Sequence, residues 1–510
     1  MLSIVHACAV IGLDGELVEV QVDFNPRAGI PSFTIVGLPD SAVRESRERV
    51  RAAIKNSGLR FPNKGYVVNL SPADLPKHGP SYDLSIAVGA LASTDQIPLT
   101  ALENSVFVGE LSLDGRVRHV KGAMPIAYAA AQNGYQRVYV PEADALEAAL
   151  IRDIDVIPIE TLGQLVEHLY GLQEIPPRTL DLEMVNKANI IDITDFQDVK
   201  GQEHVKRALE IAAAGNHNVR LVGPPGVGKS LLARAMPGIL PQLTLAEALE
   251  VTRIYSVSDM LPEDTPLMQH RPYRSPHHTI SQAGLVGGGS IPTPGEISLA
   301  HRGVLFLDEI NEFNTRTLEV MRQPIEDKQV TISRARGTLT FPANFMLIAA
   351  HNPCPCGNYN AQDAMCTCTP NMIKRYQAKL SGPLLDRIDI HVTVPRVDYD
   401  KLLNDAKGEP SASIRERVEV ARAQQTERFK DVDAIYANGD MAAGDIQTYC
   451  VLKEDAKQLL NLSVRKMRLS ARSYHRVLKL SRTIADLAGA DEIEVPHVAE
   501  AIQYRPQQDT

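Results

Sequence analysis

The sequence contains no apolar run of about 18 residues, the length at which a membrane-spanning helix becomes a candidate. Its first residues, MLSIVHACAVIGLDGE, also lack the basic segment and the small-residue cleavage site of a secretory signal peptide. Cysteine is scarce, with six in 510 residues. Without an export signal, clustered cysteines are typical of free thiols or metal ligands rather than of disulfides. These absences predict a cytoplasmic protein with no membrane association.

An excess of basic residues is also absent, since the formal net charge is −9. This is weak evidence against a nucleic-acid binder, because such domains are often basic overall. A ring that threads DNA needs only a few basic residues along its channel, however. Hydrophobic residues make up 44% of the chain and charged residues 23%, a composition that indicates globular domains with buried cores.

The pattern of apolar segments predicts a multidomain α/β protein. Residues 1–172 alternate short β-like runs with helical segments and form a mixed α/β domain, and residues 173–190, which contain paired prolines, form a linker. Residues 191–395 alternate apolar β-like runs with helices, as expected for a parallel sheet covered on both faces. Residues 396–510 have helical spacing throughout and form a helical lid domain.

The strongest motif is NVRLVGPPGVGKSLLARAM, in which a short apolar strand leads through a glycine-rich loop into a helix. This is the context that the phosphate-binding motif G-x-x-x-x-G-K-[ST] requires, and it disfavours the alternative of a glycine-rich turn with a chance lysine. Lys229 would reach the β- and γ-phosphates of ATP, and Ser230 would bind Mg²⁺. The predicted loop consists of Gly223, Pro224, Pro225, Gly226, Val227, Gly228, Lys229 and Ser230.

Further polar residues follow apolar β-like runs. In HRGVLFLDEINEF the run ends at Asp308 and Glu309, which suit an Mg²⁺ ligand and a residue that polarises the attacking water. The alternative, a helix N-cap, is disfavoured after a phosphate-binding loop. Asn352 follows the strand in NFMLIAAHNP and would orient water. Arg387, in SGPLLDRIDI, is either a surface ion-pair partner of Asp386 or Asp389 or an arginine finger for a neighbouring subunit.

Together these motifs resemble the AAA+ ATPases, in particular the branch of magnesium-chelatase ATPase subunits and MCM-type helicases. Two segments are close to the sequence motifs of that branch, namely PGEISLAHRGVLFLDEINEF and SGPLLDRIDI. The resemblance implies a ring, usually a hexamer. It assigns Lys229 and Ser230 to Walker A, Asp308 and Glu309 to Walker B, Asn352 to sensor 1, Arg387 to the arginine finger and Arg472 to sensor 2.

Two insertions bear on what such a ring acts on. RSPHHTISQAGLVGGGSIPTPGE resembles the helix-2 insert of this branch, and KQVTISRARGTLTFPANF is typical of a hairpin and resembles the pre-sensor-1 hairpin. Arg334 and Arg336 at its tip would grip DNA phosphates without reading sequence, or else form a solvated tip. A second basic segment, Val464 to Arg482, would line a DNA path or face a neighbour's triphosphate.

The first domain resembles the Lon-protease (S5-type) catalytic domain in LPKHGPSYDLSIAVGALAS and VFVGELSLDGRVRHVKGAMPIAYAAAQNG. Ser81 stands where that family has its nucleophile, which a lysine activates. Aligned without gaps from Arg116, the position of that lysine holds Met124, and Lys121 and Lys77 are out of register. The domain is therefore expected to have a Lon-like fold without peptidase activity.

A Lon-like domain, a chelatase-type ATPase and a four-cysteine insert, in this order, are similar to the ComM/YifB family. That resemblance implies a hexameric DNA helicase that drives branch migration on branched or single-stranded DNA, together with recombination proteins, during natural transformation. The alternative is a chelatase-type motor that remodels a protein partner. An ATP-dependent protease is disfavoured by Met124.

The four clustered cysteines, Cys354, Cys356, Cys366 and Cys368, form two C-x-C pairs separated by nine residues. Four thiolates can hold Zn²⁺ tetrahedrally and so fix a loop too short to fold alone. Zinc ligands usually leave two to four residues between them, so the spacing departs from the commonest pattern. We favour a zinc site over four reduced thiols.

Overall fold

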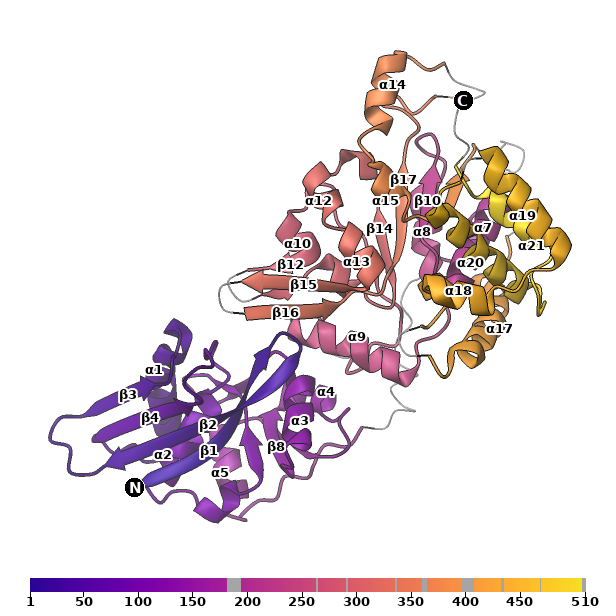
Figure 1. Cartoon of the computed structure of the whole chain (residues 1–510). Helices are drawn as coiled ribbons and strands as arrows, with labels where there is room; N and C mark the ends of the chain where they lie inside the picture. The colour runs from indigo at the N-terminus through magenta and orange to yellow at the C-terminus, as the bar shows by residue number, and fades with distance from the viewer. Residues whose placement is uncertain are drawn as a thin grey trace. The chain divides into compact units, whose positions relative to one another are not determined.

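The computed structural model describes residues 1–180, 194–262, 265–289, 292–334, 337–359, 365–396, 408–432, 435–467 and 469–506. The chain forms two compact units (Figure 1). The first unit comprises residues 1–189 and 248–268, and the second comprises residues 190–247 and 269–510. Among the described residues, no helix is both long enough and apolar enough to cross a membrane. Arg336, in the predicted hairpin tip, lies outside the described residues.

The first unit is built on a seven-stranded mixed sheet of order β3-β4-β2-β1-β5-β8-β9. Its strands are β1 (Leu2–Ile11), β2 (Asp14–Asn25), β3 (Ser32–Val36), β4 (Gly65–Ser71), β5 (Ser105–Phe107), β8 (Arg137–Pro141) and β9 (Asp155–Ile159). The β1–β2 and β2–β4 pairs are antiparallel, and the other pairs are parallel. The main helices are α1 (Ser41–Asn56), α2 (Asp83–Ala92), α3 (Ala123–Gln132), α4 (Ala145–Ala148) and α5 (Leu162–Leu169). Helix α2 is wholly buried and apolar except for Asp83 and Ser85, and it packs on β1 and β2 and also against α1.

Most of helix α9 (Leu245–Val257) belongs to the first unit, although it comes after the phosphate-binding loop in sequence. Ser256 donates a hydrogen bond to buried Glu147 at 2.5 Å. Just beyond the helix, Asp259 lies 3.0 Å from both His119 and Lys121. These polar contacts hold the end of α9 on the α3–α4 region of the first unit.

The second unit contains a five-stranded, fully parallel sheet of order β11-β14-β17-β10-β18. The strands are β11 (Tyr273–Arg274), β14 (Val304–Leu307), β17 (Met346–His351), β10 (Val219–Val222) and β18 (Ile390–Thr393). Strands β14 and β17 are buried along their whole length, as expected where helices cover both faces. Along the chain, helices precede or follow these strands. They are α7 (Glu203–Gly215), α8 (Lys229–Ala235), α12 (Thr315–Glu319), α13 (Arg322–Asp327), α14 (Pro370–Gln377) and α15 (Gly382–Leu385).

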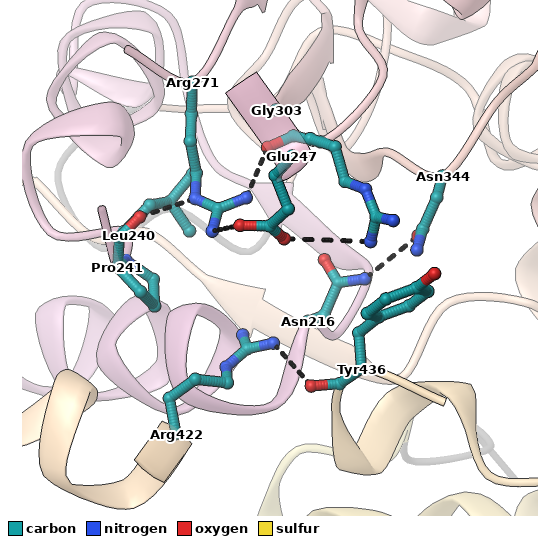
Figure 2. A pocket seen from close by; sticks show the side chains of 10 residues that line it. Asn216, Leu240, Pro241, Glu247, Arg271, Gly303, Asn344, Arg422 and Tyr436 are labelled. Atoms are coloured by element: carbon teal, nitrogen blue, oxygen red, sulfur yellow. Dashed lines mark hydrogen bonds and ion pairs between the residues drawn. The ribbon is translucent and has the colours of Figure 1, made fainter. Parts of the chain in front are cut away.

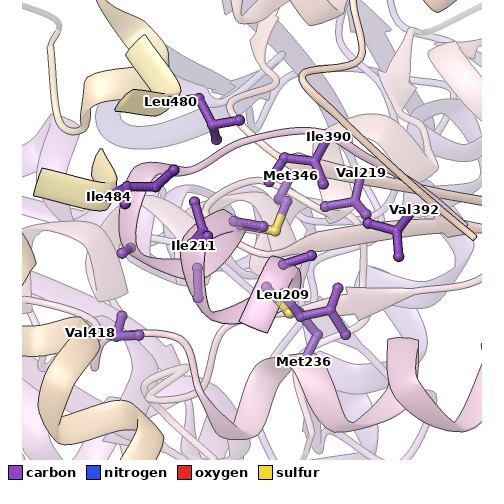
Figure 3. Packing of buried hydrophobic residues seen from close by; sticks show 14 of the residues in the cluster. Leu209, Ile211, Val219, Met236, Met346, Ile390, Val392, Val418, Leu480 and Ile484 are labelled. Carbon is purple, nitrogen blue, oxygen red and sulfur yellow. The ribbon is translucent and has the colours of Figure 1, made fainter. Parts of the chain in front are cut away.

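The C-terminal part of the second unit is helical and shares a core with the sheet. Its helices are α17 (Ser411–Phe429), α18 (Ala443–Tyr449), α19 (Glu454–Met467), α20 (Ala471–Leu487) and α21 (Val495–Gln503). Figure 3 shows Val418 of α17 and Ile484 of α20 beside Ile211 of α7, in one hydrophobic cluster with Val219 of the sheet. The predicted fold class is thereby confirmed as mixed α/β units that end in a helical region.

Both predicted insertions form secondary structure in the second unit. The first contains α10 (Gln282–Val286), the short pair β12 (Gly287–Gly288) and β13 (Thr293–Pro294), and α11 (Glu296–Leu299). The second forms the antiparallel hairpin of β15 (Gln329–Arg334) and β16 (Gly337–Pro342), with Arg334 paired to Gly337. Arg334 is exposed next to the turn.

Candidate active site

The phosphate-binding loop lies between β10 and α8, at the carboxyl edge of the parallel sheet. Strands β10, β14 and β17 are neighbours in the sheet, so the polar residues that follow each of them meet at this edge. Gly226 and Gly228 have φ angles of 80° and 88°, in the left-handed region that favours glycine. Gln202 supports the loop by donating to the carbonyl oxygen of Val227 at 2.9 Å, a role that the sequence analysis did not identify.

Lys229 joins the loop to the end of β17. Its Nζ donates hydrogen bonds to the carbonyl oxygens of Gly223 at 2.7 Å and Pro224 at 2.9 Å, and to Oδ1 of Asn352 at 3.1 Å. Burial lowers the pKa of Lys229, and the nearby carboxylates of Asp308 and Glu309 oppose that shift. The structure therefore brings together the loop lysine and Asn352.

Ser230 and Asp308 form the second contact of the site. The Oγ of Ser230 donates to Oδ2 of Asp308 at 2.7 Å, so a hydroxyl and a carboxylate oxygen are adjacent at the start of α8. Mg²⁺ binds oxygen ligands of these two kinds. The pair therefore fits a magnesium ion bound together with nucleotide phosphates. Glu309 follows with an exposed side chain and a φ of 49°, an uncommon backbone conformation for a residue other than glycine.

His351 fixes the backbone of Asn352. Arg220 donates to Nε2 of His351 at 2.8 Å, so the neutral ring carries its proton on Nδ1, which donates to the carbonyl oxygen of Asn352 at 2.6 Å. Burial, and then the charge of Arg220, lowers the pKa of His351 to about 3. This histidine stays neutral at physiological pH and orients the residue that contacts Lys229. Its position, one residue before Asn352, is the only sequence signal for it.

Arg387 is buried at 9% exposure, and its partner is neither of the two aspartates considered from the sequence. Its guanidinium lies 2.8 Å from Glu326 of α13 and donates to the carbonyl oxygen of Pro383 at 2.6 Å. Arg472 is exposed in the first turn of α20. Within the described part of the chain, no hydrogen bond or ion pair joins either arginine to the phosphate-binding loop.

The basic segment from Val464 to Arg482 divides into cations that are paired within the helical region and cations that are exposed. Arg476 pairs with buried Asp389, and Arg482 pairs with buried Asp486 at 2.9 Å. Lys479 donates to the carbonyl oxygen of Gly439 at 3.0 Å, and burial lowers its pKa. These three cations stabilise the helical region, whereas Arg465, Lys466 and Arg472 are exposed.

The four clustered cysteines meet in space. Their sulfur atoms all lie within 4.8 Å of one another, with Cys354–Cys356, Cys354–Cys366 and Cys356–Cys366 separations of 3.4, 3.7 and 3.6 Å. A tetrahedral zinc ion with Zn–S bonds of about 2.3 Å separates its sulfur ligands by ~3.8 Å. Hydrogen bonds from the backbone N–H groups of Asn358 and Thr367 lower the pKa of Cys356 to about 5, whereas burial and the neighbouring thiols raise the pKa of Cys366 and of Cys368. The fit of this donor set to Zn²⁺ therefore rests on the sulfur separations.

The sequence was compared with protein families and with known proteins. Residues 195–402 match the model "Magnesium chelatase, subunit ChlI", residues 18–144 match "Subunit ChlI of Mg-chelatase", and residues 408–505 match "Magnesium chelatase, subunit ChlI C-terminal". The chain is 42% identical over 514 residues to "Competence protein ComM" of Haemophilus influenzae, covering 99% of the chain and 97% of that protein. It is 44% identical over 507 residues to YifB of Salmonella typhimurium, with the same coverage.

The chain belongs to the ComM/YifB family. Because the three magnesium-chelatase models match in order along the chain, the chain is a chelatase-like AAA+ ATPase that carries a further domain before its ATPase core. The chain also resembles Lon protease 2 of Bacillus subtilis, at 27% identity over 191 residues, which cover 34% of each chain.

The residues that would make the first unit a peptidase are not arranged as a dyad. Met124 is buried in α3, and its backbone N–H donates to Glu147 at 2.7 Å. Lys77 is fully buried and donates to the carbonyl oxygen of Pro72, while exposed Lys121 pairs with Asp259. Among the described residues, neither lysine forms a hydrogen bond with Ser81.

Proposed function

We propose that this ATPase assembles into a hexameric ring that translocates on branched or single-stranded DNA and drives branch migration during homologous recombination in natural transformation. The observation that carries the proposal is the 42% identity to a protein named for competence, over 99% of the chain. In this proposal, DNA phosphates are bound by Arg334, at the end of β15, together with Arg336. Recombination proteins are the expected partners, and the cytoplasm is the expected location.

In the proposed ATPase cycle, Lys229 binds the β- and γ-phosphates, and Ser230 and Asp308 hold Mg²⁺, which offsets phosphate charge. Glu309 accepts a proton from the attacking water. Asn352, held by His351 and linked to Lys229 at 3.1 Å, orients that water. Arg387 leaves Glu326 to reach the triphosphate of a neighbouring subunit, and Arg472 contacts the nucleotide from the lid.

The Cys354, Cys356, Cys366 and Cys368 cluster is proposed to bind Zn²⁺. The cluster begins two residues after Asn352, so a metal there would fix the loop that leaves β17. Zinc would contribute folding energy to this loop and no chemistry to hydrolysis.

The test is ATP-dependent strand displacement on a forked or three-stranded DNA, measured beside Glu309→Gln. We expect displacement by the wild-type chain and none by the variant, which should still bind ATP. Arg334→Ala should reduce displacement and DNA-stimulated hydrolysis while leaving basal hydrolysis unchanged. Arg27→Ala, an exposed arginine of the first unit, is the matched control.

A second candidate function is a motor that remodels a protein partner, because three magnesium-chelatase models together match most of the chain. DNA distinguishes the two functions. Stimulation of ATP hydrolysis by branched or single-stranded DNA supports the helicase. Strong hydrolysis without DNA stimulation and without displacement contradicts the helicase and supports the remodelling motor.

A further inference from the structure

A second polar cavity lies in the second unit, at the opposite edge of the parallel sheet from the phosphate-binding loop (Figure 2). Asn216 comes just before β10, Gly303 just before β14 and Asn344 just before β17, so the cavity lies at the amino ends of these strands. Its volume is about 30 Å³. The lining residues are Asn216, Leu240, Pro241, Glu247, Arg271, Arg302, Gly303, Asn344, Arg422 and Tyr436.

Three arginines and a single carboxylate line this cavity, and the carboxylate is already shared. Glu247 lies 3.2 Å from the guanidinium of Arg271 and 3.7 Å from that of Arg302, and it also accepts the backbone N–H of Thr244 at 3.1 Å. Arg271 is further held by the carbonyl oxygens of Pro241 at 2.6 Å and Arg302 at 2.8 Å. Glu247 therefore has little capacity left for a third cation.

Arg422, on α17, is that third cation. Its terminal nitrogens donate only to backbone carbonyl oxygens, of Ala213 at 2.8 Å and Tyr436 at 3.3 Å (Figure 2). Its Nε is buried without a hydrogen-bond partner, and no carboxylate of the described residues forms an ion pair with it. Burial, and the charge of Arg271, lower its pKa to about 10, so it remains protonated at neutral pH.

The charges of Asp440 and Glu247 both act on Arg422, but among the described residues neither carboxylate forms an ion pair with it. Asp440 lies close enough to raise the pKa of Arg422, but its side chain accepts the backbone N–H of Ala437 at 3.1 Å and pairs with Lys328 at 3.7 Å. A cation that has been removed from water and makes no direct ion pair is unfavourable, because its lost hydration is not replaced by a contacting negative charge. A small anion in the cavity would supply the missing charge.

We propose that this cavity binds a phosphate-class oxyanion between Arg422 of the helical region and the arginines at the base of the sheet. Guanidinium groups present paired N–H donors that match the oxygens of such an anion. The cavity exceeds the ~10–15 Å³ that a single water requires, which leaves room for a compact polyatomic anion. Because α17 supplies Arg422 and the sheet supplies the other side, the anion ties the helical region to the ATPase core.

The experiment is a calorimetric titration of the full-length chain with inorganic phosphate at constant ionic strength. The phosphate-binding loop is first saturated with magnesium and a non-hydrolysable ATP analogue, so that only a second site is measured. We expect one phosphate per chain. Arg422→Gln should weaken binding about tenfold or more, the loss expected for one charge-assisted contact.

Two further variants keep the proposal falsifiable if Arg422→Gln proves unstable. Glu247→Gln removes the carboxylate that lines the cavity. It should therefore strengthen phosphate binding, whereas Arg422→Gln should weaken it. Lys430→Gln removes an exposed charge just after α17 and should change nothing. If phosphate fails to bind but a short single-stranded oligonucleotide binds with the same dependence on Arg422 and Glu247, the oxyanion is a DNA phosphate. Absence of both, or equal binding by all variants, overturns the proposal.

Discussion

Asn352 connects the phosphate-binding loop to the end of β17 in the proposed site. Its side chain accepts from Lys229 at 3.1 Å, and its backbone is held by His351 at 2.6 Å. Asn352→Ala should leave the phosphate-binding loop intact but removes the group that we propose orients water. We expect ATP hydrolysis to fall about 10²-fold, the scale of losing one polar group that acts in the transition state.

The measurement is steady-state ATP hydrolysis together with nucleotide affinity. Affinity should change less than threefold, because Lys229 keeps its two carbonyl partners. A large loss of affinity with normal turnover would show that Asn352 serves binding rather than water positioning.

His119 in the first unit provides a test by pH. A hydrogen bond with Asp144 at 2.5 Å, and a further contact with Asp259 at 3.0 Å, raise its pKa to about 9. A raised folded-state pKa stabilises the protein below the ordinary value of about 6.5, and that contribution disappears as pH rises through about 9. The side chain is half exposed, so solvent screens the effect and the stability change will be small.

Thermal unfolding of wild type and His119→Gln between pH 6 and 9.5 measures this contribution. The wild-type midpoint should fall more steeply with pH than that of the variant, and NMR titration of the ring should give a pKa near 9. Burial raises the pKa of Glu147 and the charge of His119 opposes that shift, so the NMR titration of the His119 ring is the deciding readout. Parallel curves would contradict the predicted role of His119.

At the scale of elements, the cysteine loop should depend on metal. Elemental analysis of the full-length chain is expected to find one zinc per chain, and Cys354→Ser should lower that content and loosen the loop after β17. Cys450→Ser, at a buried cysteine outside the cluster, is the matched control. A wild-type chain without zinc after purification in zinc-supplemented buffer would favour four reduced thiols.

Helix α20 is held by a buried ion network. Asp486, with no exposure to solvent, lies 2.5 Å from Arg428 and 3.0 Å from Nε of Arg482, and it accepts from Asn438 at 2.7 Å. Asp486→Asn removes the shared counter-charge of two largely buried arginines and should cost about 3–5 kcal/mol.

Urea unfolding of the second unit, followed by a probe in the helical region, measures this cost. Asp491→Asn changes an exposed acid next to the same segment and should alter stability by less than about 0.5 kcal/mol. Equal midpoints for the two variants would mean that the network contributes little.

The sequence predicted well those elements whose structure depends on residues close together in the chain. The strand before Gly223, the glycine loop and the helix from Lys229 form one local motif, and the approach of Asn352 follows because parallel strands end at the same edge. The pairing of Arg387 with Glu326 could not be predicted, because many acidic residues have equivalent local patterns. For the same reason, the basic segment of α19 and α20 gave no indication that Arg482 is buried or that Arg476 pairs with Asp389.

At the scale of the whole molecule, long-range packing escaped prediction. The cavity gathers residues from Asn216 to Tyr436, and α9 joins a unit formed mainly by residues that precede the phosphate-binding loop. Such contacts depend on which surfaces pack together. The spacing of hydrophobic residues shows which face of an element is buried, but not which other element covers it. Assembly is a further step of the same kind, and it can be tested by mixing variants.

In the proposed ring, each active site takes Glu309 from one subunit and Arg387 from its neighbour. Arg387→Ala and Glu309→Gln should each abolish hydrolysis alone. When the two inactive variants are mixed, an Arg387→Ala subunit that has a Glu309→Gln neighbour forms a site with both native residues. Random mixing in equal amounts places such a pair at roughly one interface in four of a closed, head-to-tail ring.

ATP hydrolysis of the mixture, measured with DNA present, should therefore recover towards a quarter of the wild-type rate. A mixture of Glu309→Gln with Lys229→Ala is the matched control. Both changes disable the same side of the interface, so no site becomes complete and no activity should return. Failure of the first mixture to regain activity, with rings verified by light scattering, would place Arg387 in its own subunit as a structural partner of Glu326. Recovery in the first mixture and not in the second can arise only if the site is shared, because neither variant carries a complete set of residues within one chain.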